Sequence, residues 1–441
     1  MRWNRVSTLS AAWLGSIVFF TYTFSQEASK PTRFKLSVSE RFRFTTWDNA
    51  IGFEADPDNG WTFTRHRTSL DAAWTPVPKL EIRAKLTNEF WYFIAHPQDK
   101  DFNLHEVFFD NLYFRWKRPV GLPLELTLGR QNLMLGEGFV VMDAHPLDGS
   151  RSIYFNAARM DILFNAASRL ILFYAYQPRT DTFLPVIKDR DQRLIEQPEE
   201  AVAAYFSGRI GRVGLDVYAV RKNIEATEDV PEESHINTLG SRFVAPVMER
   251  LALTGEAAYQ FGRYDEYDRN AWGGYFHLDY ALEGRGWKPG RITLGGIALS
   301  ADDATTADVE GWDPLFSRWP KWSESFIYTQ IVEYGGRIGY WSNFASLYGS
   351  VNFQVVETLE LSLTYHRCFA FEAIPWMQTA LFGFGTNRGG LLIARANFRI
   401  CKPLTGHLLY ETMGPGDFYH DGADRYHWFR FELMYRADFV K

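Results

Sequence analysis

The segment Lys79–Phe93, KLEIRAKLTNEFWYF, constrains the fold most, because apolar and charged residues alternate along it. The even positions from Leu80 to Tyr92 are mostly apolar, and the odd positions are mostly charged or polar. Successive side chains of a strand point to opposite faces, so the pattern predicts a strand with one apolar and one charged face. The segment is much longer than a usual strand of about 5–6 residues. Its length and its aromatic end, Phe90–Tyr92, favour a membrane-spanning strand over a strand of a soluble sandwich.

The composition supports a membrane protein built from strands. The chain has 441 residues with a mean hydropathy of −0.25, and after the N-terminus it has no uninterrupted apolar run near the length of a helical span. Aromatic residues make up 17%, a high share that suits two aromatic belts at the membrane surfaces. These features predict a β-barrel and exclude a bundle of transmembrane helices.

Alternation of this kind recurs along the whole chain, which predicts an all-β fold, a transmembrane antiparallel β-barrel of about 18 strands. Short connections rich in turn residues, such as 75–78 and 357–358, alternate with long polar ones, such as 132–152 and 301–344. This asymmetry is typical of short periplasmic turns and long extracellular loops. When the strands are counted with both chain termini on the periplasmic side, residues 331–342 belong to a long strand or loop and do not form a separate strand.

The N-terminus predicts export to a bacterial outer membrane. Basic residues in Met1–Arg5 precede an apolar stretch, and Thr23 and Ser25 stand at suitable positions before a cut ahead of Gln26. We therefore expect a signal peptide over 1–25 and a barrel over 26–441, without a plug or periplasmic domain; a membrane anchor is the alternative for the first segment. Phe439 lies two residues before the end, whereas barrel-insertion signals usually end on an aromatic residue.

The two cysteines predict neither a disulfide nor a cofactor. Cys368 falls near the outer end of one expected strand and Cys401 at the inner end of the next, about 30 Å apart at ~3.3 Å per residue, which is too far for a bridge. No CxxC motif occurs, so haem attachment and cysteine-type zinc sites are excluded. We expect no metal and no cofactor.

Basic residues occupy the inward face of the first and last expected strands. First and last strands are neighbours in a closed barrel, so these residues predict one basic wall that attracts anions. The alternative is that acids such as Glu81, Glu89 and Glu432 pair with the arginines and only stiffen the wall. The inward basic residues that we expect to line the pore are Arg41, Arg43, Arg65, Arg67, Arg83, Lys85, Arg115, Arg395, Arg399 and Arg430.

A second group of candidate residues surrounds the loop 132–152. Arg130 lies on the apolar parity of its strand, and Gly129 permits a bulge that turns it inward. Arg159 and Asp161 share an inward face on the next strand. The alternative function for this group is a salt bridge that anchors a loop.

These motifs carry a family resemblance. Gly129-Arg130-Gln131, Gly136-Glu137-Gly138 and Arg159-Met160-Asp161, with Trp312–Phe316 and Arg318–Trp322, resemble the alginate-export porin family. The resemblance implies a monomeric 18-stranded outer-membrane barrel with an arginine-rich pore, which in the best-known member passes an anionic uronate polymer. It also implies that Arg130, Arg159 and Asp161 belong to the pore.

The loop 301–344 is the longest and carries Trp312, Trp319 and Trp322 beside Arg318 and Lys321. Indole faces with a polar rim suit sugar rings. The alternative is an interfacial loop or one packed on itself. We also expect the loop to fold inward and constrict the pore.

Other function classes find little support. The net charge is −6 and no basic segment stands apart from acids, which argues against nucleic-acid binding. His277 and Asp279 share an inward face, but no GxSxG, HExxH or P-loop motif accompanies them, so we expect no catalytic residues and no enzyme. The expected partners are the lipid bilayer and an anionic solute. We expect a passive channel for such solutes, for example an acidic saccharide. A barrel that binds a surface partner through its loops is the alternative.

Overall fold

The computed structural model describes residues 33–49, 53, 60–95, 106–142, 154–282, 288–317, 321–324, 342–374 and 381–440. The expected signal peptide, 1–25, and all but the last residue of the segment 331–342 lie outside these residues. The described residues form 18 strands and one short 3-10 helix. No helix among them is both long and apolar enough to cross a membrane.

The strands follow one another along the chain with few other elements between them. Their bounds are β1 (Phe34–Asp48), β2 (Trp61–Val77), β3 (Leu80–Ala95), β4 (Val107–Lys117), β5 (Leu124–Gln131), β6 (Phe155–Asn165), β7 (Ser168–Gln177), β8 (Glu199–Ile210), β9 (Val213–Ile224), β10 (Ser234–Met248), β11 (Leu251–Tyr264), β12 (Tyr267–Ala281), β13 (Lys288–Leu299), β14 (Phe344–Val356), β15 (Leu359–Phe369), β16 (Asn387–Cys401), β17 (Leu404–Pro415) and β18 (Tyr426–Val440), with the 3-10 turn η2 (Pro119–Gly121) between β4 and β5.

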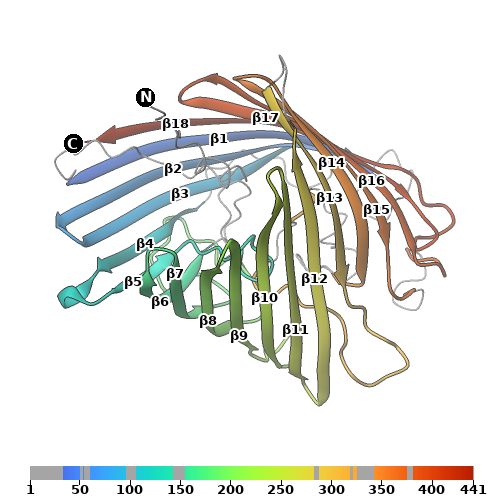
Figure 1. Ribbon diagram of the computed structural model, residues 1–441, viewed down its shortest axis with the longest axis horizontal. Coiled ribbons are helices and arrows are strands. Elements are labelled where there is room, and N and C mark those ends of the chain that lie inside the picture. Colours follow the sequence, from blue (N-terminus) through green and yellow to red (C-terminus); the bar gives the residue numbers. More distant parts are fainter. Residues whose placement is uncertain are drawn as a thin grey trace, which may run out of the picture. The chain divides into compact units, whose positions relative to one another are not determined.

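Each strand pairs antiparallel with the next one in the chain, and β1 also pairs with β18 from Lys35↔Val440 to Asp48↔His427. The sheet is therefore a closed ring of 18 strands. In Figure 1 the first strand (blue) and the last strand (red) lie side by side. The predicted barrel and its strand number are confirmed. Closure satisfies the backbone groups of every strand, which a bilayer requires because it offers no water to them.

The connections alternate in length as predicted, with one exception. On the side where β1 begins and β18 ends the turns are short, such as Gly211–Arg212 between β8 and β9. The opposite side carries the long loops, but β11 and β12 are joined there by only Asp265 and Glu266. Asp265 has a φ of 51°, the left-handed conformation of a tight turn. Alternation runs through this hairpin almost unbroken, which is why the sequence did not reveal the turn.

The two faces of the sheet differ in the way a lipid-facing barrel requires. The outward residues Phe34, Leu70 and Trp74 are 40–49% exposed, although they are large and apolar. The inward residues Arg41 and Arg43 of β1 are buried. Large exposed apolar side chains on one face, with charged groups packed on the other, reverse the pattern of a water-soluble protein.

The aromatic end of β3 is divided between the two faces. Tyr92 points outward and is 38% exposed, as an aromatic belt requires. Trp91 points inward and stacks on Phe63 of β2, with ring centroids 4.7 Å apart. Adjacent residues of a strand face opposite sides, so a run of three aromatic residues cannot belong entirely to the outer belt.

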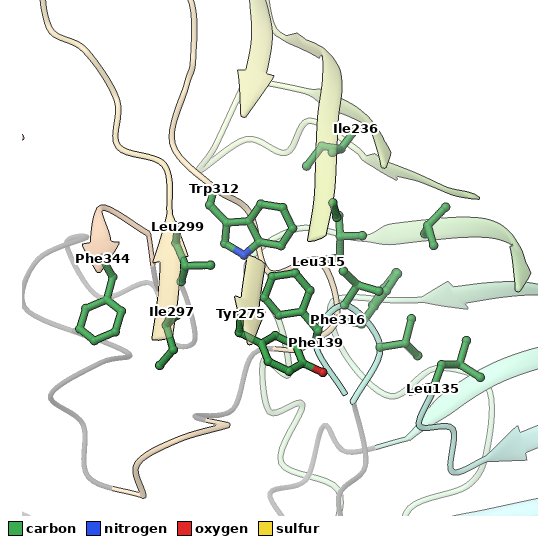
Figure 2. Close-up of a cluster of buried hydrophobic side chains, with 14 of the residues drawn as sticks. Leu135, Phe139, Ile236, Tyr275, Ile297, Leu299, Trp312, Leu315, Phe316 and Phe344 are labelled. Carbon is green, nitrogen blue, oxygen red and sulfur yellow. The ribbon is translucent and has the colours of Figure 1, made fainter. Parts of the chain in front are cut away.

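A hydrophobic core lies on the inward face, where two loops fold against the wall of β6 to β12. Segment 132–142 follows β5, and segment 300–317 follows β13. Figure 2 shows Phe139 of the first beside Trp312 of the second; the two rings stack with centroids 5.0 Å apart. The Phe316 amide also donates to the Val140 carbonyl at 3.1 Å. These contacts fix two long loops inside the barrel, so they narrow its lumen.

The cysteines lie where the sequence placed them. Cys368 is buried near the end of β15, and Cys401 is exposed at the end of β16. Both are free thiols, as predicted.

Candidate functional site

Arginines pack against one another across β1 and β2. Arg41 pairs in register with Arg67, and Arg43 pairs with Arg65. Like charges directly opposite each other destabilise a sheet. The arrangement therefore needs nearby carboxylates, and four carboxylates, three from strands and one from a loop, pair with the basic side chains.

Glu89 of β3 is the first of these carboxylates. It lies opposite Arg67 in the β2–β3 register and accepts from Arg67 Nη1 at 2.6 Å. It also pairs with Arg65, and Arg41 Nη2 lies 3.9 Å from it. One carboxylate thus serves three guanidinium groups.

Asp110 of β4 is the second carboxylate, and a bulge places it. The β3–β4 register skips Asp110, since Lys85 faces Asn111 and the next pair is Leu86 with Phe109. The bulge turns Asp110 inward, where it accepts from Lys85 Nζ at 2.5 Å and from Arg67 Nη2 at 3.2 Å.

Glu432 of β18 extends the network across the closure of the barrel. Arg43 of β1 donates to it through Nε at 2.5 Å. His407 of β17 lies 3.4 Å from the same carboxylate through Nδ1. The first and last strands therefore form one continuous charged surface, as their pairing predicts.

The fourth carboxylate comes from a loop. Glu324 belongs to the described segment 321–324, and it pairs with Arg430 of β18 and with Arg395 of β16, whose Nη1 lies 3.2 Å away. Ser323 Oγ and the Glu324 amide both donate to Glu411, at 2.5 and 2.8 Å. Burial disfavours the Glu324 carboxylate, but the charges of Arg430, Arg395 and other nearby basic groups outweigh it and hold the pKa below its ordinary value.

We call this surface the basic wall. Among the residues that the structure describes, seven arginine and lysine side chains of this surface pair with four carboxylates. The basic members are Arg41, Arg43, Arg65, Arg67, Lys85, Arg395 and Arg430, and the carboxylates are Glu89, Asp110, Glu324 and Glu432.

Other predicted pore residues lie outside this network, each with a partner of its own. Arg83 pairs with Asp71, and its side chain is 36% exposed. Arg115 lies 3.1 Å from Glu125 and 3.8 Å from Glu81.

Arg159 and Asp161 form a two-point pair on β6, with both N–O distances at 2.7 Å. Arg399 is exposed near the turn between β16 and β17, and donates at 3.4 Å to the Glu357 carbonyl. The structure therefore brings the residues of the basic wall together. Arg83, Arg115, Arg159 and Asp161 lie outside it in separate ion pairs, and Arg399 lies outside it near a turn.

Arg130 has the contacts of a loop anchor. Gly129 before it has a φ of 115°, and a Cβ there would lie 2.3 Å from the Leu112 carbonyl oxygen, so the position requires glycine. Arg130 is buried, donates to both oxygens of Asp181 at 2.6 and 2.8 Å, and stacks over Tyr154 at 3.9 Å. Asp181 belongs to the loop between β7 and β8, which Arg130 holds against the barrel.

A second charged cluster, the Glu137 cluster, lies where the two inward loops meet the wall. Glu137 pairs with Arg242 of β10 at 2.9 Å, with Lys321 at 3.2 Å and with His277 of β12 at 3.4 Å. Burial disfavours the Glu137 carboxylate, but the hydrogen bond from His277 and the charge of Lys321 outweigh it and hold its pKa below the ordinary value. Burial lowers the pKa of Lys321 in spite of Glu137.

The sequence marked Gly136-Glu137-Gly138 only as a family motif and did not reveal this cluster or Glu324. Both depend on loop residues, and strand periodicity carries no information about where a loop docks. The family motif was the one available signal for Glu137.

The described tryptophans of loop 301–344 pack against other side chains of the protein. Trp312 is buried against Phe139, and Trp322 packs edge-on against Tyr275 at 5.7 Å. Arg318 and Trp319 lie outside the described residues. Both described tryptophans thus pack against other parts of the protein, a second inward loop and strand β12.

A closed ring of 18 antiparallel strands, with an apolar outer face and a charged lumen narrowed by loops, defines a porin-like barrel of the outer membrane. Solved structures agree with this class. The chain resembles the outer-membrane protein OpdK of Pseudomonas aeruginosa, with 10% identity, a TM-score of 0.58, and coverage of 92% of this chain and 99% of the other. The BenF-like porin of Pseudomonas fluorescens is 11% identical, with a TM-score of 0.57 and coverage of 92% of this chain and 99% of the other. OpdQ of Pseudomonas aeruginosa is 10% identical, with a TM-score of 0.55 and the same two coverages.

At these identities the solved structures establish the fold alone. The family comes from the sequence: a model described as alginate export matches residues 30–370. The match spans more than half of the chain, so this protein belongs to the alginate-export family of outer-membrane barrels, as the motifs predicted. No curated protein matches it.

Proposed function

We propose that the barrel is a passive channel for anionic solutes, and that acidic oligo- or polysaccharides of the uronate type are the solutes it fits best. The observation that carries the proposal is the basic wall, a lumen surface in which seven described arginine and lysine side chains gather around four described carboxylates. The family description, alginate export, supports the same solute class.

The arrangement suits permeation rather than tight binding. A low-dielectric wall focuses the field of its charges into the lumen and raises the local concentration of anions. Conduction also requires that no single contact hold the solute for long. Each arginine of the wall already shares a carboxylate, which weakens its hold on a passing anion.

The test is ion selectivity in planar bilayers, measured as the reversal potential in a potassium chloride gradient. Lys85 and Arg395 are the test positions, since their side chains are 20% and 25% exposed within the wall. We expect an anion-selective channel, and the double variant Lys85→Glu/Arg395→Glu should lower the chloride-to-potassium permeability ratio about tenfold, roughly 1.4 kcal/mol.

The matched control is Arg399→Glu, a single reversal outside the basic wall, which should change the ratio much less. A wild-type channel that prefers cations contradicts the proposal. So does a double variant that keeps the wild-type ratio. Bilayers that stay sealed over correctly assembled barrels would favour the alternative, a barrel that binds a surface partner through its long loops.

We propose no catalytic step and a monomeric channel. His277 is the best catalytic candidate of the sequence, yet carboxylates flank both of its ring nitrogens. Asp279 lies 2.6 Å from Nδ1, and Glu137 lies 3.4 Å from Nε2. A ring held this way serves as an ion-pair partner of the inward loops, which does not favour a general base.

A further inference from the structure

Glu324 differs from the other three carboxylates of the basic wall in the way the chain holds it. Glu89, Asp110 and Glu432 belong to strands, and the hydrogen bonds of the sheet fix their backbones. Glu324 reaches the wall from a loop segment, 321–324, and belongs to no strand. It can therefore leave the wall without breaking the barrel.

The two ends of this segment contact opposite partners. Lys321 binds the Glu137 cluster, with its Nζ 2.8 Å from the Glu137 carbonyl oxygen. Three residues later, Glu324 lies on β16 and β18 through Arg395 and Arg430. The segment thus bridges from the inward loops to the basic wall and delivers one carboxylate to it.

The place that Glu324 occupies has the features of a carboxylate-binding subsite. Two guanidinium groups take separate oxygens: Arg395 Nη1 contacts Oε1 at 3.2 Å, and Arg430 Nη1 contacts Oε2. Charge-assisted pairs of this kind are strong and favour a planar, two-oxygen anion. The Arg395 side chain is 25% exposed and that of Glu324 is 20% exposed, so the subsite borders solvent.

We propose that Arg395 and Arg430 form a subsite for a carboxylate of the transported solute, and that Glu324 occupies this subsite until such a solute displaces it. The inference rests on the proposed function. It adds where the carboxylate of the solute binds and which side chain competes with it. A uronate unit carries the same group as the glutamate side chain, so it can exchange for Glu324 with little change in charge. A neutral sugar brings no such group and does not compete.

This exchange answers a physical need of the channel. An arginine pair left empty in the lumen would hold the first carboxylate tightly and slow its passage. A tethered internal carboxylate lowers the net affinity, because every solute that binds must first release Glu324. The subsite then stays selective for carboxylates and still releases them, as conduction requires.

The test compares Glu324→Gln with wild type in planar bilayers. A galacturonic acid trimer is added as the carboxylated probe and maltotriose as the neutral one, and affinity is taken from the concentration that halves the current. We expect Glu324→Gln to bind the acidic trimer about tenfold more tightly, roughly 1.4 kcal/mol. Maltotriose should bind equally to both channels, and adding Arg430→Gln to the variant should remove the gain.

Glu81→Gln is the matched control. Glu81 is a strand carboxylate of the lumen that accepts from Tyr113 at 3.0 Å and lies outside the proposed subsite. It should change affinity for the acidic trimer less than twofold. Equal gains from Glu81→Gln and Glu324→Gln would mean a general charge effect and would overturn the subsite.

Two further outcomes separate this proposal from the channel function. An anion-selective wild type in which Glu324→Gln changes nothing overturns the subsite alone. A wild type without anion preference overturns the proposed function and the subsite together. Glu324→Asp keeps the charge but shortens the reach, so its affinity should lie between the other two; an affinity weaker than wild type would contradict displacement.

Discussion

Cations point into the lumen from both sides of this barrel, but the two sides use them differently. On the basic wall, Arg395 is partly exposed and its carboxylate partner comes from a loop. The opposite side, from β9 to β12, is here called the loop-holding wall. Its cation Lys222 is fully buried, lies 3.2 Å from Glu199, and donates to the Leu315 carbonyl at 2.9 Å.

The difference lies in what the loops bring to each wall. The loop-holding wall receives backbone carbonyls, apolar side chains and one loop carboxylate, Glu137, which pairs with Arg242 of β10. Gln260 of β11 donates to the Asp313 carbonyl, and Arg269 of β12 donates to the Gly311 carbonyl. The basic wall receives one carboxylate, Glu324. On the loop-holding wall the inward cations therefore fasten loops, whereas on the basic wall most of the cations pair with strand carboxylates.

The largest expected effect comes from making the same substitution on each wall. Lys222→Met removes the ammonium that faces the buried Glu199, which costs about 3–5 kcal/mol in the free energy of unfolding. Arg395→Met removes a partly exposed partner, and Glu324 keeps Arg430, so the cost is about 0–1 kcal/mol. Urea unfolding of barrels refolded in vesicles, followed by tryptophan fluorescence, measures both. Similar losses for the two variants would contradict the division into two walls.

Strand periodicity carried the prediction of the fold. The alternation in Lys79–Phe93 places Arg83 and Lys85 on one face, and the same rule places Arg41 and Arg430 on neighbouring strands of a closed barrel. The barrel, its strand number and its free thiols followed from such patterns. The tight turn at Asp265 escaped because alternation continues through it.

The sequence predicted only part of the candidate site. Periodicity identifies which arginines point inward but not which carboxylates meet them. Asp110 depends on a bulge, and Glu324 and Glu137 depend on loops that fold inward. Arg130 shows the same limit. Gly129 predicted a bulge that turns Arg130 inward, whereas the registers of β5 run through it without a shift, and the partner, Asp181, lies in a loop 51 positions further along.

A smaller effect should follow from weakening the contact between the two inward loops. Phe139→Leu keeps the apolar volume roughly constant but removes the stacking on Trp312 and the edge contact with Tyr275. Aromatic pairs contribute about 0.5–1.5 kcal/mol beyond their buried area. We expect noisier open-channel current with unchanged ion selectivity, since the basic wall is intact. A shift in selectivity of the size seen with Lys85→Glu/Arg395→Glu would show that the loop core and the basic wall are not separate.

The smallest expected effect concerns acid: lowering the pH from 7 to 4.5 should leave the open-channel noise unchanged. The pKa of Glu137 and that of Glu324 are both held below the ordinary value of 4.5. A carboxyl group whose pKa is lower in the folded state stabilises the fold above its unfolded pKa, and that contribution is lost only as pH falls through the lower, folded value. The two carboxylates, Glu137 and Glu324, therefore stay charged down to pH 4.5, and open-channel noise should be the same at pH 7 and pH 4.5.

In this experiment the variant Glu137→Gln tests the loop-holding wall without changing the basic wall. It removes the carboxylate that holds Lys321 on the loop-holding side and leaves Glu324 on the basic wall, so noise should rise at both pH values while selectivity stays. A wild-type channel whose noise rises between pH 7 and pH 4.5 would require a titrating group other than these two carboxylates. A variant as quiet as wild type would show that the contact of Glu324 with Arg395 and Arg430 holds the segment by itself.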